Sequence, residues 1–375
     1  MSGRERLHVD HSGKRWARRL GSIATVTALG LSMAAPAEAC SPEPNCRDFV
    51  MPVAMAQGAP KDQRIDVTYC QPQLHGQGGR SSKHRKVIVD TPGAGYNKTY
   101  YDWPQDPNKY SYTRAALKDG ISVVNYTPVG RVGGKSTDPS VGRVGGKSTH
   151  PESTSVTIQS DAFVLSQLID LVHKWGYDDV TSMGHSQGSG VALRNAATNH
   201  NVQRLILTGY LNTARNPQVL ANNYSANLDP SFQNLALDPG YLTSKPGLRS
   251  EFYSEAADPE VIKYDDKTRD VISATALGGY AVDQAASPAN SLARGVDVPV
   301  LFVTGEDDII FCQDPRYACS DRRAILNLER TYFVNSPNID YDSVAHTGHD
   351  LATATTASRT AAAIDAWVSA PSMAR

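Results

Sequence analysis

The 375-residue chain lacks a large excess of charge of either sign. It has 37 Lys and Arg residues against 38 Asp and Glu residues, which gives a formal net charge of −1. Domains that bind nucleic acid commonly carry a basic patch or a high isoelectric point. The balance therefore indicates that nucleic acid is not the partner.

Metal-binding spacings are also missing from the sequence. Its cysteines form no C-x-x-C pair, and its histidines are not clustered at the spacing of zinc ligands. We therefore expect no metal and no other cofactor. In an oxidising compartment Cys312 and Cys319 are close enough in sequence to close a small loop, and Cys70 could pair with Cys40 or Cys46.

The only candidate membrane segment is too short, because a spanning helix needs ~20 apolar residues. Basic residues between positions 4 and 19 precede an apolar run at 23–35, and Ala37-Glu38-Ala39 follow it. This order is typical of an export signal with its cleavage site. We interpret residues 1–39 as a signal peptide, which predicts a secreted protein, periplasmic or extracellular, without a stable membrane anchor.

Apolar runs alternate with amphipathic stretches along the rest of the chain. Such short runs fit strands buried on both faces, so the alternation predicts an α/β fold, a mainly parallel sheet with helices on both faces. We predict strands at residues 64–70, 86–90, 121–126, 179–183, 202–208 and 298–304, and helices from Ser160, at 187–198 and at 352–368.

This regularity fails between residues 210 and 295. Asn, Pro, Asp and Tyr are frequent there, and only short helical fragments such as residues 269–277 stand out. Long loops in compact domains are usually functional or disordered. We predict that residues 210–295 form a cap inserted into a core made of residues 40–209 and 296–375. A decorated loop region without a catalytic part is the alternative.

A duplicated segment lies between residues 129 and 151. Residues 129–139 recur as 141–151, and each copy contains Gly-Gly-Lys-Ser-Thr. A phosphate-binding loop needs a glycine where the two copies have Val129 and Val141, and no helical pattern begins directly after either copy. We expect a Gly-rich surface loop rather than a nucleotide site.

The sequence Gly-His-Ser-Gln-Gly at residues 184–188 matches the pattern G-x-S-x-G. A predicted strand precedes it and a predicted helix follows it. At such a turn the glycines let the chain bend sharply and hold the serine hydroxyl clear of the backbone. The context predicts Ser186 as a nucleophile, with His185 as a packed neighbour. An ordinary serine in a glycine-rich turn is the alternative.

A serine nucleophile needs a base, and the base needs a carboxylate that orients it. The predicted strand at 298–304 runs into an acidic turn, and two histidines precede the last predicted helix. We predict His349 as the base and Asp308 as the acid. Asp307 and Glu306 are reserve candidates for the acid, and His346 is expected to be structural.

Together these segments resemble the α/β-hydrolase superfamily from about residue 86 to the C-terminus. The chain order Ser186, Asp308, His349 is the order of that fold. The resemblance implies a serine esterase- or lipase-like enzyme that acts by acyl transfer on a small-molecule ester or lactone and uses no cofactor.

The resemblance also implies an oxyanion hole made of two N–H donors. The amide of Gln187, next to the nucleophile, matches the first donor. Residues 92–96, Pro-Gly-Ala-Gly-Tyr, resemble the family's oxyanion loop, although Pro92 stands where the family has a histidine. We predict the amide of Ala94 as the second donor, with Gly95 and Tyr96 as rivals.

Two other functions stay open. A peptidase or amidase on the same scaffold could use acidic cap residues to recognise a peptide's amino terminus, although a solvated surface is the preferred interpretation of these residues. These residues are Glu251, Glu255, Asp258 and Glu260. A non-catalytic binding protein that kept the fold is the third reading.

Overall fold

The computed structural model describes residues 44–73, 85–133, 147–216 and 221–371. The predicted signal peptide at 1–39, Cys40 and the middle of the duplicated segment lie outside the described residues.

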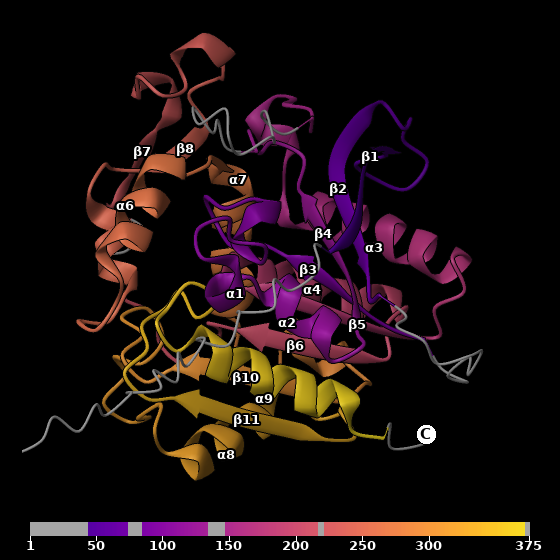
Figure 1. Cartoon of the computed structure of the whole chain (residues 1–375), viewed down its shortest axis with the longest axis vertical. Coiled ribbons are helices and arrows are strands. Elements are labelled where there is room, and N and C mark those ends of the chain that lie inside the picture. The colour runs from indigo at the N-terminus through magenta and orange to yellow at the C-terminus, as the bar shows by residue number, and fades with distance from the viewer. Residues whose placement is uncertain (1–43, 74–84, 134–146, 217–220, 372–375) are drawn as a thin grey trace, which may run out of the picture. The chain divides into compact units, whose positions relative to one another are not determined.

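An eight-stranded sheet forms the centre of residues 44–371, in the order β1-β2-β4-β3-β5-β6-β10-β11 (Figure 1). The strands from β4 to β11 are parallel, and β2 and then β1 are added antiparallel at one edge. The strands are β1 Asn45–Val53, β2 Gln63–Gln71, β3 Lys86–Thr91, β4 Ser122–Thr127, β5 Asp179–His185, β6 Arg204–Thr208, β10 Val300–Gly305 and β11 Ile339–Val344.

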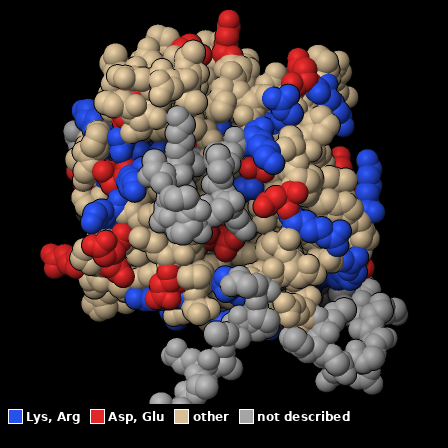
Figure 2. Space-filling model, turned by 45° about the horizontal axis from the view of Figure 1, so that its top comes forward, with Lys and Arg blue, Asp and Glu red and all other residues tan. Residues whose placement is uncertain are grey.

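Two disulfides occur among the described residues. One joins Cys46 of β1 to Cys70 of β2, and the other joins Cys312 to Cys319 in the loop after β10. Of the two partners left open for Cys70, the structure therefore selects Cys46. In the part of the chain that the structure describes, no helix combines the length and the apolar character needed to cross a membrane. On the face drawn in Figure 2, Lys and Arg are mixed with Asp and Glu.

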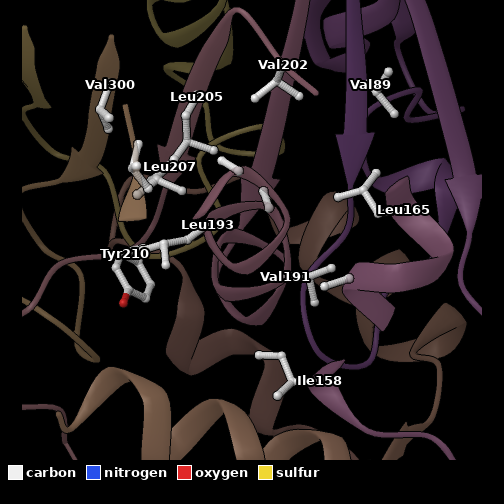
Figure 3. Close-up of a cluster of buried hydrophobic side chains, with 14 of the residues drawn as sticks. Val89, Ile158, Leu165, Val191, Leu193, Val202, Leu205, Leu207, Tyr210 and Val300 are labelled. Atoms are coloured by element: carbon white, nitrogen blue, oxygen red, sulfur yellow. The ribbon is translucent and has the colours of Figure 1, made fainter. Parts of the chain in front are cut away.

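Strand β3 shows why the sheet is buried on both faces. Successive side chains of a strand point to opposite faces. Val87 and Val89 therefore enter one apolar cluster, and Ile88 enters another. The first contains residues of α3 and α4 (Figure 3) and of α8, and the second contains residues of α2 and α9. The helices are α1 Pro107–Tyr110, α2 Tyr112–Lys118, α3 Ile158–Lys174, α4 Gln187–Asn199, α8 Arg322–Tyr332 and α9 Ala357–Ser369. The predicted α/β fold with helices on both faces is confirmed.

Some predicted boundaries were wrong by a few residues. Helix α3 begins at Ile158 because Thr157, not Ser160, is its N-cap, and the hydroxyl of Ser160 accepts the Thr157 N–H in return. Helix α9 begins at Ala357 rather than at residue 352. Strands β1 and β11, which form the two edges of the sheet, were not predicted. In β11, Asp340, Asp342 and Ser343 interrupt the apolar residues, so it lacks the continuous apolar run of a strand buried on both faces.

Residues 210–295 contain a second, three-stranded antiparallel sheet. Its strands are β7 Asn223–Ser225, β8 Tyr241–Ser244 and β9 Ile272–Ser273, accompanied by helices α6 Pro259–Thr268 and α7 Ala274–Gln284. The predicted helical fragment at 269–277 was right only for residues 274–277, which belong to α7. Ile272 and Ser273 pair with β8, and the Ser273 hydroxyl caps α7, so the helix starts only after them.

The described ends of the duplicated segment, residues 129–133 and 147–151, pair with each other. The Gly130 N–H donates to the carbonyl oxygen of Thr149 at 2.8 Å, and the Ser148 hydroxyl accepts the Asp66 N–H at 3.1 Å. Val129, Gly130, Arg131 and Ser148 are buried. A loop lying wholly on the surface was therefore the wrong expectation for these ends.

Candidate active site

The segments predicted to carry the site all follow the carboxyl ends of parallel strands of the sheet. Strands β3, β5, β10 and β11 are parallel, so their carboxyl ends point the same way. Residues 92–96 follow β3, Ser186 follows β5, Asp308 follows β10 and His349 follows β11. The topology therefore brings residues from distant parts of the sequence to the same region.

Ser186 stands on a sharp turn between β5 and α4. Its φ of 53° and ψ of −121° are strained for a residue with a side chain. The flanking glycines permit this turn: a Cβ on Gly188 would lie 2.3 Å from the Thr91 carbonyl oxygen, and one on Gly184 would lie 2.3 Å from that of Gly188. Helix α4 begins at Gln187, whose N–H belongs to the first turn and has no partner within the helix.

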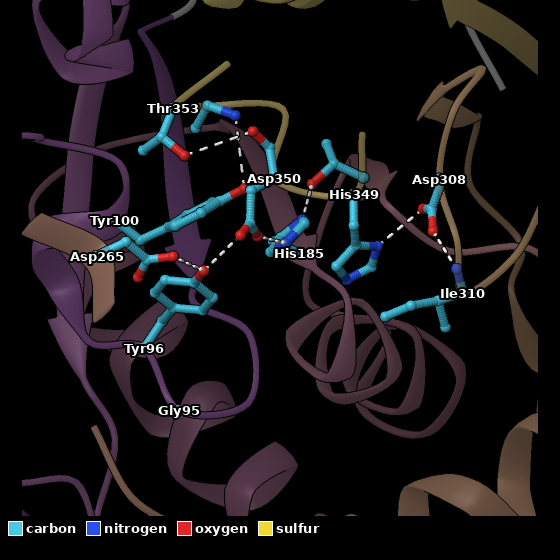
Figure 4. Close-up of polar contacts among 12 residues, drawn as sticks. Gly95, Tyr96, Tyr100, His185, Asp265, Asp308, Ile310, His349, Asp350 and Thr353 are labelled. Atoms are coloured by element: carbon cyan, nitrogen blue, oxygen red, sulfur yellow. Dashed lines mark hydrogen bonds and ion pairs between the residues drawn. The ribbon is translucent and has the colours of Figure 1, made fainter. Parts of the chain in front are cut away.

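His349 and Asp308 form a buried pair. The Nδ1 atom of His349 lies 2.8 Å from Oδ2 of Asp308 (Figure 4), and Oδ1 of Asp308 accepts the amides of Ile310 at 2.7 Å and Phe311 at 3.2 Å. Burial opposes both charges, yet the attraction between the two groups raises the pKa of His349. The same attraction and the two amides hold the pKa of Asp308 below its ordinary value. The geometry therefore fixes one tautomer of His349 and stabilises its charged form.

The reserve candidates for these positions do not reach the pair. Asp307 is exposed, and the Glu306 carboxylate accepts the Ser343 hydroxyl at 2.9 Å instead. His346 is exposed on the loop after β11 and has a φ of 55°.

A second histidine–carboxylate pair lies behind the first. His185 Nε2 is 3.2 Å from Oδ1 of Asp350, and the His185 ring stacks on Tyr100 at 4.6 Å (Figure 4). Burial and the nearby charge of His349 lower the pKa of His185, which favours the neutral ring. The Tyr96 hydroxyl lies between the carboxylates of Asp350 and Asp265, at 2.5 Å and 2.8 Å. His185 is thus the packed neighbour that we expected, whereas no sequence pattern pointed to Asp350.

The loop after β3 approaches Ser186 closely. A Cβ on Gly93 would lie 3.3 Å from that of Ser186. The Tyr96 N–H donates to the Gly93 carbonyl oxygen at 3.2 Å. Because this amide already has a partner, the amides of Ala94 and Gly95 remain as the candidate donors to an oxyanion. On the other side, the Gln187 side chain accepts a 3.3 Å hydrogen bond from the buried guanidinium of Arg131.

A cavity of about 70 Å³ joins these residues, with Ser186, Gln187, His349 and Ala94 on its wall. Most of the remaining wall comes from residues 210–295, including Arg215, Phe252, Leu277 and Tyr280. These side chains were not predicted, because the irregular sequence of this segment gives no periodicity from which their direction could be read. No group of three or more His, Cys, Asp or Glu side chains among the described residues is arranged to hold a metal ion.

Neither a protein-family model nor a curated protein matches the sequence. Several solved structures are similar to the chain. A thermostable carboxyl esterase from Bacillus coagulans has a TM-score of 0.55 and 14% identity, over 86% of this chain and 97% of the esterase. A monoglyceride lipase from Saccharomyces cerevisiae has a TM-score of 0.52 and 12% identity, over 82% and 92%.

The monoacylglycerol lipase of Paleococcus ferrophilus has a TM-score of 0.50 and 15% identity, over 76% of this chain and 95% of the lipase. At such low identities the likeness is one of fold. Together with the sheet order and the strand-end geometry, it leads to one conclusion: the chain has the α/β-hydrolase fold, as the sequence motifs indicated.

Proposed function

We propose that the chain is an exported serine hydrolase that cleaves a carboxylic ester or lactone through an acyl-enzyme. The observation that carries this proposal is the buried Asp308–His349 pair, 2.8 Å apart, in a cavity whose wall also holds Ser186 on its strained turn. The lipases and esterases that share the fold support an ester as the substrate. The two disulfides support export, because such bonds persist in oxidising compartments.

In the first half of the proposed reaction, Ser186 Oγ attacks the ester carbonyl carbon while His349 Nε2 accepts its proton. Asp308 holds the imidazole by Nδ1 and stabilises its positive charge. The amides of Gln187 and Ala94 stabilise the oxyanion. The carbon–oxygen bond to the alcohol then breaks, and His349 returns the proton to the leaving oxygen.

In the second half, His349 accepts a proton from a water molecule as the water attacks the acyl carbon. The bond to Ser186 breaks, Ser186 recovers the proton from His349, and the acid leaves. The ester and the water account for every atom of the two products, the alcohol and the acid, so the reaction needs no cofactor.

The peptidase alternative depended on acidic residues that would recognise a peptide's amino terminus. None of Glu251, Glu255, Asp258 and Glu260 is among the described residues of the cavity wall. This favours the ester hydrolase. Comparing the turnover of p-nitrophenyl esters with that of aminoacyl p-nitroanilides tests the preference, and faster turnover of the anilides would reverse it.

Labelling with a fluorophosphonate probe tests the serine mechanism and separates an enzyme from a binding protein. We expect the wild-type protein to be labelled and Ser186→Ala to be unlabelled. Ser250→Ala is a matched control, because Ser250 is exposed and lies outside the cavity wall. A folded wild-type protein that resists the probe, or equal labelling of Ser186→Ala, would refute the proposal.

A further inference from the structure

The cavity wall carries positive charge without a matching negative charge. Arg215 and Arg249 contribute to it, and the described wall residues include no Asp or Glu. The two arginines differ in how their charge is balanced, and this difference indicates which of them is available to a substrate.

Arg249 is already engaged within the protein. Its guanidinium donates to the Gly95 carbonyl oxygen at 2.7 Å and to the Ser244 hydroxyl at 3.0 Å. It lies 4.2 Å from the centre of the Tyr96 ring, and Asp265 is 3.9 Å away. Arg249 therefore stabilises the loop after β3, and its charge is already balanced within the protein.

Arg215 is not balanced in this way. Its guanidinium lies over the Tyr280 ring, 5.4 Å from the ring centre, and its one hydrogen bond to a described residue is a long 3.5 Å contact with the Ala281 carbonyl oxygen. The neighbouring acids are occupied: Asp283 accepts Arg194 at 2.7–3.0 Å, and Glu329 accepts Asn212 at 2.6–2.8 Å. Within the described ranges Arg215 has no carboxylate partner.

Tyr280 supplies an independent sign of a missing ligand. Its side chain is 4% exposed, yet its hydroxyl has no hydrogen-bond partner among the described residues. Leaving a buried donor unpaired costs free energy. Burial raises the pKa of Tyr280, so the hydroxyl keeps its proton and can donate it. Its ring packs on α4 where Gly190 has no side chain.

We infer that the substrate carries a carboxylate in addition to its ester bond, and that Arg215 and the Tyr280 hydroxyl bind it. This inference rests on the proposed ester hydrolysis at the same cavity. Carboxylates are the natural partners of a guanidinium, and a tyrosine hydroxyl adds a second donor. The substrate class is then a monoester of a dicarboxylic acid, or an ester whose alcohol part bears the carboxylate. A substrate ammonium group would be repelled by the same wall.

Matched substrate pairs test the inference through the ratio of their kcat/KM values. One pair is p-nitrophenyl glutarate and its neutral methyl ester, and the other is 4-acetoxybenzoate and its methyl ester. We expect the wild-type enzyme to prefer the carboxylate member of at least one pair by about 10- to 100-fold, which is the effect of a hydrogen bond to a charged group. Ratios near one for both pairs would overturn the inference.

Variants assign the preference to the two side chains. In Arg215→Gln and Tyr280→Phe the ratio should fall toward one, and Arg215→Lys should keep part of it. Arg330→Gln is the control, because Arg330 is exposed on α8 and outside the cavity wall, and it should keep the wild-type ratio. A wild-type ratio in Arg215→Gln would contradict the proposal.

A binding measurement separates this inference from the proposed function. Calorimetric titration of glutarate into the wild-type protein and into Arg215→Gln requires no turnover. Binding that Arg215→Gln weakens about tenfold or more supports the carboxylate site even if no ester is cleaved. Absent or unaltered binding overturns it, even if neutral esters are cleaved and the fluorophosphonate probe labels Ser186.

Discussion

The carboxylate of Asp308 is bound by two backbone amides as well as by His349. Two backbone amides fix one carboxylate oxygen, and His349 takes the other. In Asp308→Asn the amide group can keep the shape of this contact but not its charge, and it permits the wrong tautomer of His349. We expect kcat for an ester to fall about ten-thousand-fold with little change in KM. Steady-state kinetics check this, and a loss smaller than tenfold would remove Asp308 from the mechanism.

The charge on His349 also determines how activity depends on pH. Burial opposes the charge, but Asp308 outweighs it, so the pKa of His349 lies above its ordinary 6.5. In the proposed mechanism only the neutral ring can accept the proton of Ser186. We therefore expect kcat/KM to rise with pH through an inflection above about 6.5, and to do so at lower pH in Asp308→Asn. An inflection at or below 6.5 in the wild-type enzyme would argue against the pair.

At the scale of elements, the contact between α4 and α7 depends on a glycine. A Cβ on Gly190 would lie 2.5 Å from Cδ2 of Tyr280. Alanine favours a helix over glycine by up to ~1 kcal/mol, but overpacking of this kind costs ~1–3 kcal/mol. We expect Gly190→Ala to lower the free energy of unfolding by about 1 kcal/mol or more, measured by urea denaturation.

Gly278→Ala is the matched control for this prediction. Gly278 lies within α7, and a Cβ there would meet no atom within 4 Å. The substitution should therefore stabilise the protein by up to ~1 kcal/mol. Equal effects of the two substitutions would show that helix propensity alone decides both.

The elements that were predicted correctly share one property: the pattern of apolar and polar residues in their own sequence matches their burial in the fold. The buried strand at 86–91 contains the apolar run Val87-Ile88-Val89, and Ser186 lies between a buried strand and a helix, so both could be predicted from neighbours in sequence. Edge strand β11 and the short strands at 210–295 depend on pairing with distant residues. Arg215 and Tyr280 are far apart in the sequence although they are in contact in the fold, and no local pattern marks them.

At the scale of the whole molecule, several carboxyl groups are buried with raised pKa values. Burial raises the pKa of Asp161 to about 6 and those of Glu329 and Asp365 to about 7. Between their unfolded values near 4 and these folded values, the folded state holds protons that the unfolded state has released. The free energy of unfolding should therefore fall as pH rises from about 4 to about 7. His185, whose pKa is lowered, acts in the opposite direction.

Denaturation at pH 5 and pH 8 measures this dependence, and Asp365→Asn isolates one group. The Tyr112 hydroxyl donates to Oδ1 of Asp365 at 2.9 Å, and an asparagine oxygen can still accept it. The variant should lose part of the difference between the two pH values, on the order of 2 kcal/mol. An unchanged difference would mean that Asp365 does not titrate in this range.

The paired ends of the duplicated segment have a genetic consequence. The first copy supplies Gly130 and Arg131, and the second supplies Ser148 and Thr149. The described contacts therefore use the beginning of one copy and the end of the other, which together amount to a single copy of the repeat. A chain without residues 134–145 would read Val-Gly-Arg-Val-Gly-Gly-Lys-Ser-Thr-His-Pro across the junction and would retain every residue that makes these contacts. Replication slippage that adds or removes one twelve-residue period here would therefore leave the reading frame and these contact residues unchanged. Natural alleles that differ in length should differ at this loop by multiples of one period.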